Sequence, residues 1–261
     1  MSANLVASRP GAYVFYNVKR LLSDWSLLAF GIGLPVVLYL VFGATLTDMD
    51  VRLAHGNFAA YVMISMAVYG GITGAVGQIG SVVVESNTGW SRQLALTPLT
   101  RGKRIAGLIV PALVSVVLPV AAVFLTGFLT GSEMSAKAWA TGFVFACLSS
   151  IPFTFYGSAV AYAFRSPTAV SIAATALVPL AFFGNMFAPI SPTMLKIGMF
   201  TPMYGPSTLS RYWLTDGAQS ISQDPWFVQH DLWVGIVNIL VWAAVFALAT
   251  ALLRRRTLER Q

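Results

Sequence analysis

Residues that commonly carry out enzyme chemistry are scarce in this sequence. Its two histidines, His55 and His230, have no set of ligand residues nearby, and its single cysteine, Cys147, lies in an apolar run. A disulfide or a metal site built on cysteines is therefore excluded. The sequence also contains no G-x-x-x-x-G-K-[ST], H-E-x-x-H or G-x-S-x-G motif. The chain thus lacks a P-loop for ATP and a recognisable hydrolase site, and we expect it not to be an enzyme.

One polar segment does have a pattern that could act on a partner. Residues 85–101 read E-S-N-T-G-W-S-R-Q-L-A-L-T-P-L-T-R. Asn87 or Thr88 is suited to cap a short helix. Trp90 and Leu94 stand four residues apart, so they share one helix face. The pattern predicts a short helix that carries a two-residue apolar knob.

The elements that must position this segment are membrane helices. The chain is 57% hydrophobic and only 10% charged, with a mean hydropathy of +0.74. Soluble domains are about one quarter charged, so this chain cannot cover a water-facing surface. Six apolar segments reach or exceed the roughly 20 residues that cross a bilayer. We expect one all-α integral membrane domain, 1–261, with spans at 26–46, 58–84, 105–131, 138–164, 168–188 and 232–253.

Two features precede the first span. Lys19 and Arg20 are typical of a signal peptide, but the apolar run is long, and bulky Phe42 stands where cleavage needs a small residue. We therefore favour a membrane span. Residues 11–25 also carry an apolar stripe at helical spacing, formed by Phe15, Val18, Leu22 and Trp25. An amphipathic helix in the membrane interface and a cytoplasmic extension of the first span fit this stripe equally well.

Basic residues predict the orientation. With the N-terminus inside, twelve of the sixteen Lys and Arg residues are cytoplasmic and four are external, the bias that the positive-inside rule describes. Both termini and the loop 85–104 are then cytoplasmic, and 189–230 is external. Two apolar pieces there, 193–200 and 207–214, are too short to cross and predict a short external helical hairpin. The net charge of +7 then suits anionic lipids at the inner face, and we expect no nucleic-acid partner.

The predicted spans contain no Asp, Glu, Lys, Arg or His. Ion-coupled carriers need such groups near the midplane, and many channels need rings of charge. Both classes are therefore disfavoured. The few polar side chains inside the spans, Gln78, Asn185 and Asn238, are expected to form hydrogen bonds between helices.

The segment 85–101 resembles the cytoplasmic coupling loop of ABC-transporter permeases of the type-2 export family. Glu85 matches the acid of that loop, four residues before Gly89, and Pro98 and Arg101 match the proline and the basic residue. The run from Gly89 to Leu99 is similar to a subgroup common in Gram-positive bacteria. This sequence departs from the pattern at Asn87 and Trp90, where an acid and a threonine are common, which changes the expected contacts. The coupling-loop residues are Glu85, Gly89, Trp90, Arg92, Gln93, Leu94, Pro98 and Arg101.

The resemblance implies a permease subunit in a bacterial plasma membrane. Two such chains, identical or related, pair with two copies of a separate ATP-binding subunit, which carries ATP and magnesium. The loop 85–104 docks on that subunit, and the assembly exports a hydrophobic or amphipathic compound such as a drug, an antibiotic or a lipid. A scaffold or sensor that moves nothing, and an ATP-independent carrier, are the alternatives.

Aromatic and methionine side chains suit varied apolar ligands. A possible substrate surface, whose members could equally pack helices or face lipid, consists of Tyr39, Phe42, Tyr61, Met66, Tyr69, Phe182, Phe183 and Met186.

Overall fold

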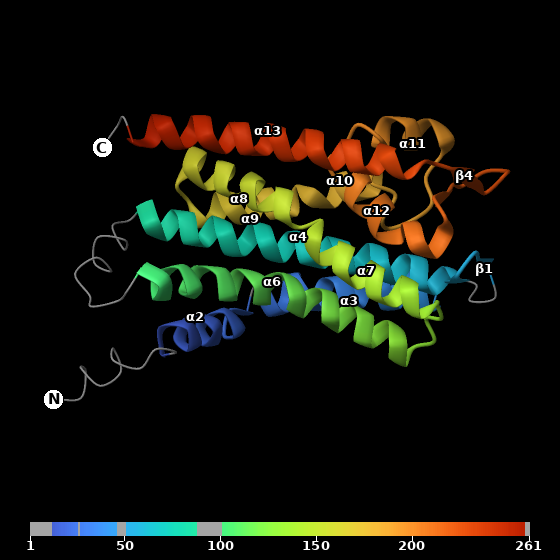
Figure 1. The fold of residues 1–261 in the computed structure, drawn as a ribbon, viewed down its shortest axis with the longest axis horizontal. Helices are drawn as coiled ribbons and strands as arrows, with labels where there is room; N and C mark the ends of the chain where they lie inside the picture. The colour runs from blue at the N-terminus through green and yellow to red at the C-terminus, as the bar shows by residue number, and fades with distance from the viewer. Residues whose placement is uncertain (1–11, 26, 46–50, 88–100, 259–261) are drawn as a thin grey trace.

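The computed structural model describes residues 12–25, 27–45, 51–87 and 101–258, which form a mostly helical bundle (Figure 1). Four helical segments are long and apolar enough to cross a membrane: Phe58–Ser86, Ile105–Leu129, Ala136–Phe164 and Leu232–Arg256. Two further apolar helical segments are shorter, Ala29–Thr45 and Pro167–Phe183. This architecture suits a multi-pass membrane protein.

The N-terminal part contains a separate amphipathic helix. Helix α2 (Ala12–Leu22) ends before the next helical stretch, which consists of the π-helix η1 (Leu27–Gly33), α3 (Leu34–Tyr39) and the π-helix η2 (Leu40–Thr45). α2 packs on α6 (Arg101–Leu129). Phe15 and Leu22 of its apolar stripe remain exposed, as does Trp25, which follows the helix. An outward apolar stripe on a separate helix favours the interfacial helix over an extension of the first span.

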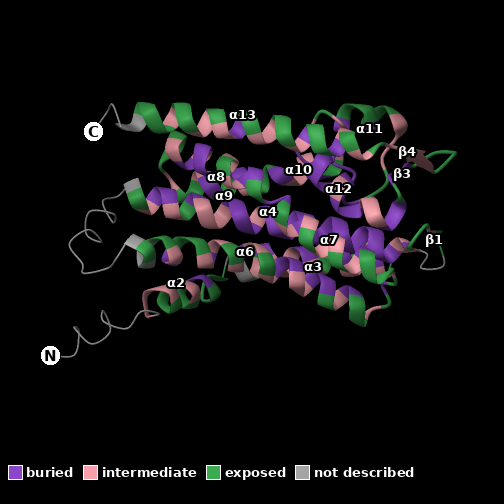
Figure 2. Ribbon diagram, viewed as in Figure 1, coloured by how far each residue is buried: buried purple, intermediate pink, exposed green. Residues whose placement is uncertain are grey.

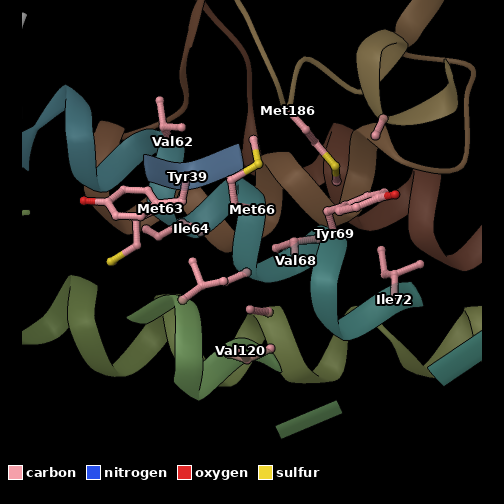
Figure 3. Packing of buried hydrophobic residues seen from close by; sticks show 14 of the residues in the cluster. Tyr39, Val62, Met63, Ile64, Met66, Val68, Tyr69, Ile72, Val120 and Met186 are labelled. Carbon is pink, nitrogen blue, oxygen red and sulfur yellow. The ribbon is translucent and has the colours of Figure 1, made fainter. Parts of the chain in front are cut away.

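Helix α4 (Phe58–Asn87) is the centre of the bundle, buried along most of its length (Figure 2). It begins after Asn57, whose Oδ1 accepts the Ala60 backbone N–H at 3.0 Å and so caps the helix. A Cβ on Gly74 would lie 2.0 Å from the Ser115 carbonyl oxygen of α6. Only glycine permits that approach, which lets the two backbones pack closely. Figure 3 shows Met63, Ile64 and Ile72 of α4 in the core with Val120 of α6.

The predicted fourth and fifth spans are interrupted. The fourth consists of α7 (Ala136–Leu148) and α8 (Ile151–Phe164), and the fifth of α9 (Pro167–Thr175) and α10 (Leu177–Phe183). Pro152 stands at the start of α8, where its missing N–H costs no helical hydrogen bond. The fifth span ends at residue 183 and not at the predicted 188, because Asn185 adopts a left-handed φ of 56°.

The opposite ends of the bundle differ in character. α2, the end of α4, the start of α6 and the C-terminal end of α13 (Leu232–Leu258) lie at one end in Figure 1. Two short antiparallel hairpins lie at the other: β1 (Arg52–Leu53) with β2 (Gly56–Asn57), and β3 (Ala218–Ser220) with β4 (Phe227–Gln229). The all-α prediction missed these hairpins, which are too short to give a strand pattern.

The two short helices predicted for 189–230 are present as α11 (Pro192–Gly198) and α12 (Tyr204–Thr215). α12 does not lie on the surface, because it packs between α4, α7 and α13 and is buried at most positions. Its Gly205 meets α13 closely, and Asn238 Oδ1 accepts the Gly205 N–H at 3.0 Å. Asn238 also donates to the carbonyls of Met199 and Thr201. Asn238 therefore holds α13 to the segment before it by hydrogen bonds, as predicted.

Candidate functional sites

The predicted coupling loop stands between α4 and α6 in the sequence, and the end of α4 and the start of α6 lie at the end of the bundle that also carries α2 (Figure 1). Glu85 lies in the last turn of α4, and Arg101 is the first residue of α6. The other coupling residues lie outside the described residues: Gly89, Trp90, Arg92, Gln93, Leu94 and Pro98. Both ends of the loop are thus placed on neighbouring, closely packed helices.

Helix α2 contacts both helices that flank the loop. The Arg20 guanidinium donates to both carboxylate oxygens of Glu85, with 3.1 Å from Nη1 to Oε2. The Glu85 hydrogen bond raises the pKa of Arg20 above its ordinary value. On the other side, Asn17 Nδ2 donates to the Gly107 carbonyl of α6 at 3.2 Å. These contacts connect α2 to the end of α4 and the start of α6.

The Arg20–Glu85 pair is more important for geometry than for stability. Its side chains are 59% and 34% exposed, so the pair is expected to contribute only about 0–1 kcal/mol. A bidentate contact between a guanidinium and a carboxylate nevertheless fixes the orientation of both side chains. A cavity of about 450 Å³ adjoins the pair, and residues of α2, α4 and α6, including Gln78, form most of its lining. The pair therefore links the last turn of α4 to α2.

The eight possible substrate residues do not form one surface. Tyr39, Tyr61, Met66, Tyr69 and Met186 are buried in the main core, whereas Phe42 and Phe183 are partly buried and Phe182 is exposed. Figure 3 shows four of the buried ones, Tyr39, Met66, Tyr69 and Met186, within the packed helices. The Tyr39 hydroxyl is hydrogen-bonded to Thr130 and Ser132, and Tyr69 packs edge-on against Phe187. These contacts favour a packing role for Tyr39 and Tyr69.

Three of the eight, Phe42, Tyr61 and Met186, line one cavity at the hairpin end of the bundle. This outer cavity has a volume of about 750 Å³. Its wall combines side chains from η2, the start of α4, the segment after α10 and the β3–β4 hairpin. The sequence interpretation missed several of its members: Val51, Phe58, Val62, Asn185, Phe187, Ala188, Pro189, Ser220, Ile221, Ser222, Pro225, Trp226 and Phe227. No described lining residue is charged.

A fully buried arginine lies behind this cavity. Arg211 of α12 is 0% exposed. Its guanidinium donates to Ser65 Oγ at 2.9 Å, to the Asn185 carbonyl at 2.8 Å and to Gln219 Oε1 at 2.8 Å. It also stacks 4.0 Å from the centre of the Tyr61 ring, a cation–π contact. Within the described part of the chain, no carboxylate forms an ion pair with it.

The sequence interpretation counted Arg211 only as an external basic residue. Its position on a helix with Ser207, Thr208 and Ser210 was the available signal, because a helix with such small polar residues can pack inside a bundle. The described residues contain no group of three or more His, Cys, Asp or Glu side chains suited to a metal. No protein-family model and no curated protein matches this chain.

Proposed function

We propose that the chain is the permease subunit of an ATP-driven ABC exporter. The observation that carries the proposal is the sequence of the loop 85–101, which resembles the coupling loop of type-2 export permeases. The contacts of Glu85 with α2 support it, because they provide a mechanical path from the loop into the bundle. The absence of a P-loop from the sequence means that ATP must be hydrolysed by another subunit.

In this proposal the assembly contains two permease chains, identical or related, and two ATP-binding subunits in a bacterial plasma membrane. ATP-driven closure of those subunits pulls on the loop 85–104. The movement passes through Glu85 and Arg20 to α2, and through α4 to the centre of the bundle. A hydrophobic or amphipathic compound is thereby moved outward.

We also propose six membrane spans with both termini in the cytoplasm. The four long helices account for four crossings. The segments Ala29–Thr45 and Pro167–Phe183 each contain 17 residues, which is the lower limit of about 17 residues for a span. Six crossings place the loop 85–104 and the basic C-terminal end on the same side, in agreement with the positive-inside rule.

The topology is tested by reporter fusions. Fusions after residues 50, 135 and 220 should report an external position, and fusions after residues 95 and 261 a cytoplasmic one. The alternation follows because each crossing determines the side of the next. A single inverted signal among the five would contradict the six-span arrangement.

The need for a partner is tested by ATP hydrolysis. The full chain, purified alone in detergent, should hydrolyse no ATP. The chain purified mildly from the membranes of its own cells should bring a P-loop protein and Mg-ATPase activity with it. Robust hydrolysis by the chain alone, after contaminating ATPases are excluded, would refute the proposal. So would a native preparation that contains no P-loop protein.

A further inference from the structure

The outer cavity has the size and lining of a small-molecule site. Its volume of about 750 Å³ lies within the range of about 300–1,000 Å³ that holds drug-sized ligands. Aromatic rings from separate segments surround it: Phe42, Phe58, Tyr61, Phe187, Trp226 and Phe227. Against this apolar lining, the side chains of Asn185 and Tyr61 form a polar wall.

Asn185 presents an unused acceptor in this wall. Its Nδ2 donates to the Ser220 carbonyl at 2.8 Å and to the Tyr61 hydroxyl at 3.3 Å. Because a carbonyl can only accept, the bond to Ser220 fixes which end of the amide is Nδ2. The other end, Oδ1, is buried and has no hydrogen-bond partner among the described residues. A buried acceptor without a donor is unfavourable, so a ligand that supplies one gains binding energy.

Tyr61 offers the matching donor. Its hydroxyl oxygen accepts from Asn185 Nδ2 and from the Ser220 backbone N–H, both at 3.3 Å. The hydroxyl hydrogen therefore has no acceptor in the hydrogen bonds of the described residues. An acceptor on Asn185 and a donor on Tyr61 thus stand side by side. A hydroxyl or an amide, which both donates and accepts, is the group that satisfies the two together.

The buried positive charge of Arg211 disfavours binding of a cation in the cavity. The Arg211 guanidinium lies 4.0 Å from the Tyr61 ring centre and is fully buried, so water and salt screen it weakly. Asp224, next to the lining residue Pro225, is solvent-exposed and is screened far more strongly. A positively charged ligand would therefore be repelled by Arg211, whereas a neutral one would not.

We propose that the outer cavity binds a neutral, largely apolar molecule that carries a hydroxyl or an amide. The polar group donates its hydrogen to Asn185 Oδ1 and accepts the Tyr61 hydroxyl hydrogen. A cation of the same shape binds more weakly. Binding depends on the cavity alone, whereas a role of this ligand as the exported compound rests on the proposed function. A membrane lipid with a free hydroxyl and a compound delivered from the cell share this chemistry.

The test uses three probes with one apolar body. Tritium-labelled 1-pyrenemethanol, its methyl ether and 1-pyrenemethylammonium are bound to the full chain in phosphatidylcholine discs, and binding to protein-free discs is subtracted. The alcohol should bind about tenfold more tightly than either the ether or the ammonium. Equal binding of the three probes, or tightest binding of the ammonium, would overturn the proposal.

Two variants each remove one polar group of this wall. Asn185→Gly is compatible with the φ of 56° at this position, and Tyr61→Phe keeps the ring that faces Arg211. Asn185→Gly should lower the affinity for the alcohol to that for the ether and leave the affinity for the ether unchanged, because only the alcohol donates to Asn185. Tyr61→Phe should weaken binding of both the alcohol and the ether, because the oxygen of each accepts the Tyr61 hydroxyl hydrogen. Unchanged binding of the alcohol by both variants, with wild-type elution in size-exclusion chromatography, would overturn the proposal.

Two similarly exposed tryptophans test whether the probes bind in this cavity. Trp226, 59% exposed, lines the cavity, and Trp233, 62% exposed, does not. Trp226→Ala should weaken binding of all three probes, and Trp233→Ala should weaken none. The reverse pattern would place the site elsewhere and refute the proposal.

Mass spectrometry of the purified chain identifies the source of the natural ligand. A hydroxyl-bearing lipid retained by the wild type but lost in Asn185→Gly indicates a lipid, and a retained non-lipid alcohol or amide lost in the same variant indicates a delivered compound. A molecule retained equally by both proteins contradicts the assignment to this wall. These measurements need no ATPase, so their failure is distinguishable from failure of the proposed function.

Discussion

Replacement of Arg211 by methionine is expected to lower the melting temperature of the purified chain by roughly 10 °C. The change removes the donor for Ser65 Oγ, the Asn185 carbonyl and Gln219 Oε1. Buried acceptors left without a donor cost about 1–3 kcal/mol each, so a loss of about 3–5 kcal/mol is expected for the network. For a chain of this size, each kcal/mol corresponds to about 2–4 °C.

Two further variants separate charge from geometry at this position. Arg211→Lys keeps the charge but loses the planar guanidinium that donates to several acceptors. Its melting temperature should therefore lie between those of the wild type and Arg211→Met. Lys196→Met is the control, because Lys196 of α11 is exposed and its loss should change little. A melting temperature of Arg211→Met that matches the control would show that the buried network is not needed for stability.

The double change Trp90→Ala with Leu94→Ala should release the ATPase and abolish transport. Both residues lie on one face of the predicted loop helix and together form its apolar knob. Buried aromatic anchors commonly cost more than about 2 kcal/mol when truncated, which corresponds to a roughly 30-fold or greater loss of affinity. Co-purification of the ATPase, and transport in membrane vesicles, measure the effect.

A matched control lies at the opposite end of the molecule. Trp233 and Val237 also stand four residues apart, on α13, and both are exposed. Trp233→Ala with Val237→Ala should leave the ATPase bound. Trp213 and Leu214 are unsuitable for this purpose, because Trp213 stacks on Phe145 and Leu214 is 1% exposed. If the loop variant folds and retains its ATPase as well as this control does, the docking role of the knob is wrong.

The parts of the fold that were predictable from the sequence depend on local properties. The lengths of α4, α6 and α13 follow from apolar runs. The stripe on α2 follows from helical spacing, and the start of α9 from Pro167. Each of these signals needs only neighbouring residues, so one sequence is enough to detect it.

The buried arginine and the outer cavity were not predictable in the same way. The partners of Arg211 come from α4, from the turn after α10 and from β3, and Ser65 is 146 positions away in the chain. Hydropathy gave α12 no sign of burial, because the groups that accept from the Arg211 guanidinium belong to other elements. The cavity likewise needs residues from several distant segments. Its ligand chemistry depends on which hydrogen bonds are already made, which no sequence pattern reports.

The most direct test of the proposed function is site-specific photo-crosslinking from the loop in intact cells. A benzophenone amino acid replaces Trp90 in the cytoplasmic loop and, in a separate control, the exposed Trp226 of the opposite end. We expect irradiation to attach a P-loop ATPase to the chain from position 90 and not from position 226. An adduct with no ATPase from position 90, in a chain that is inserted and folded, would contradict the assignment as an ABC permease subunit.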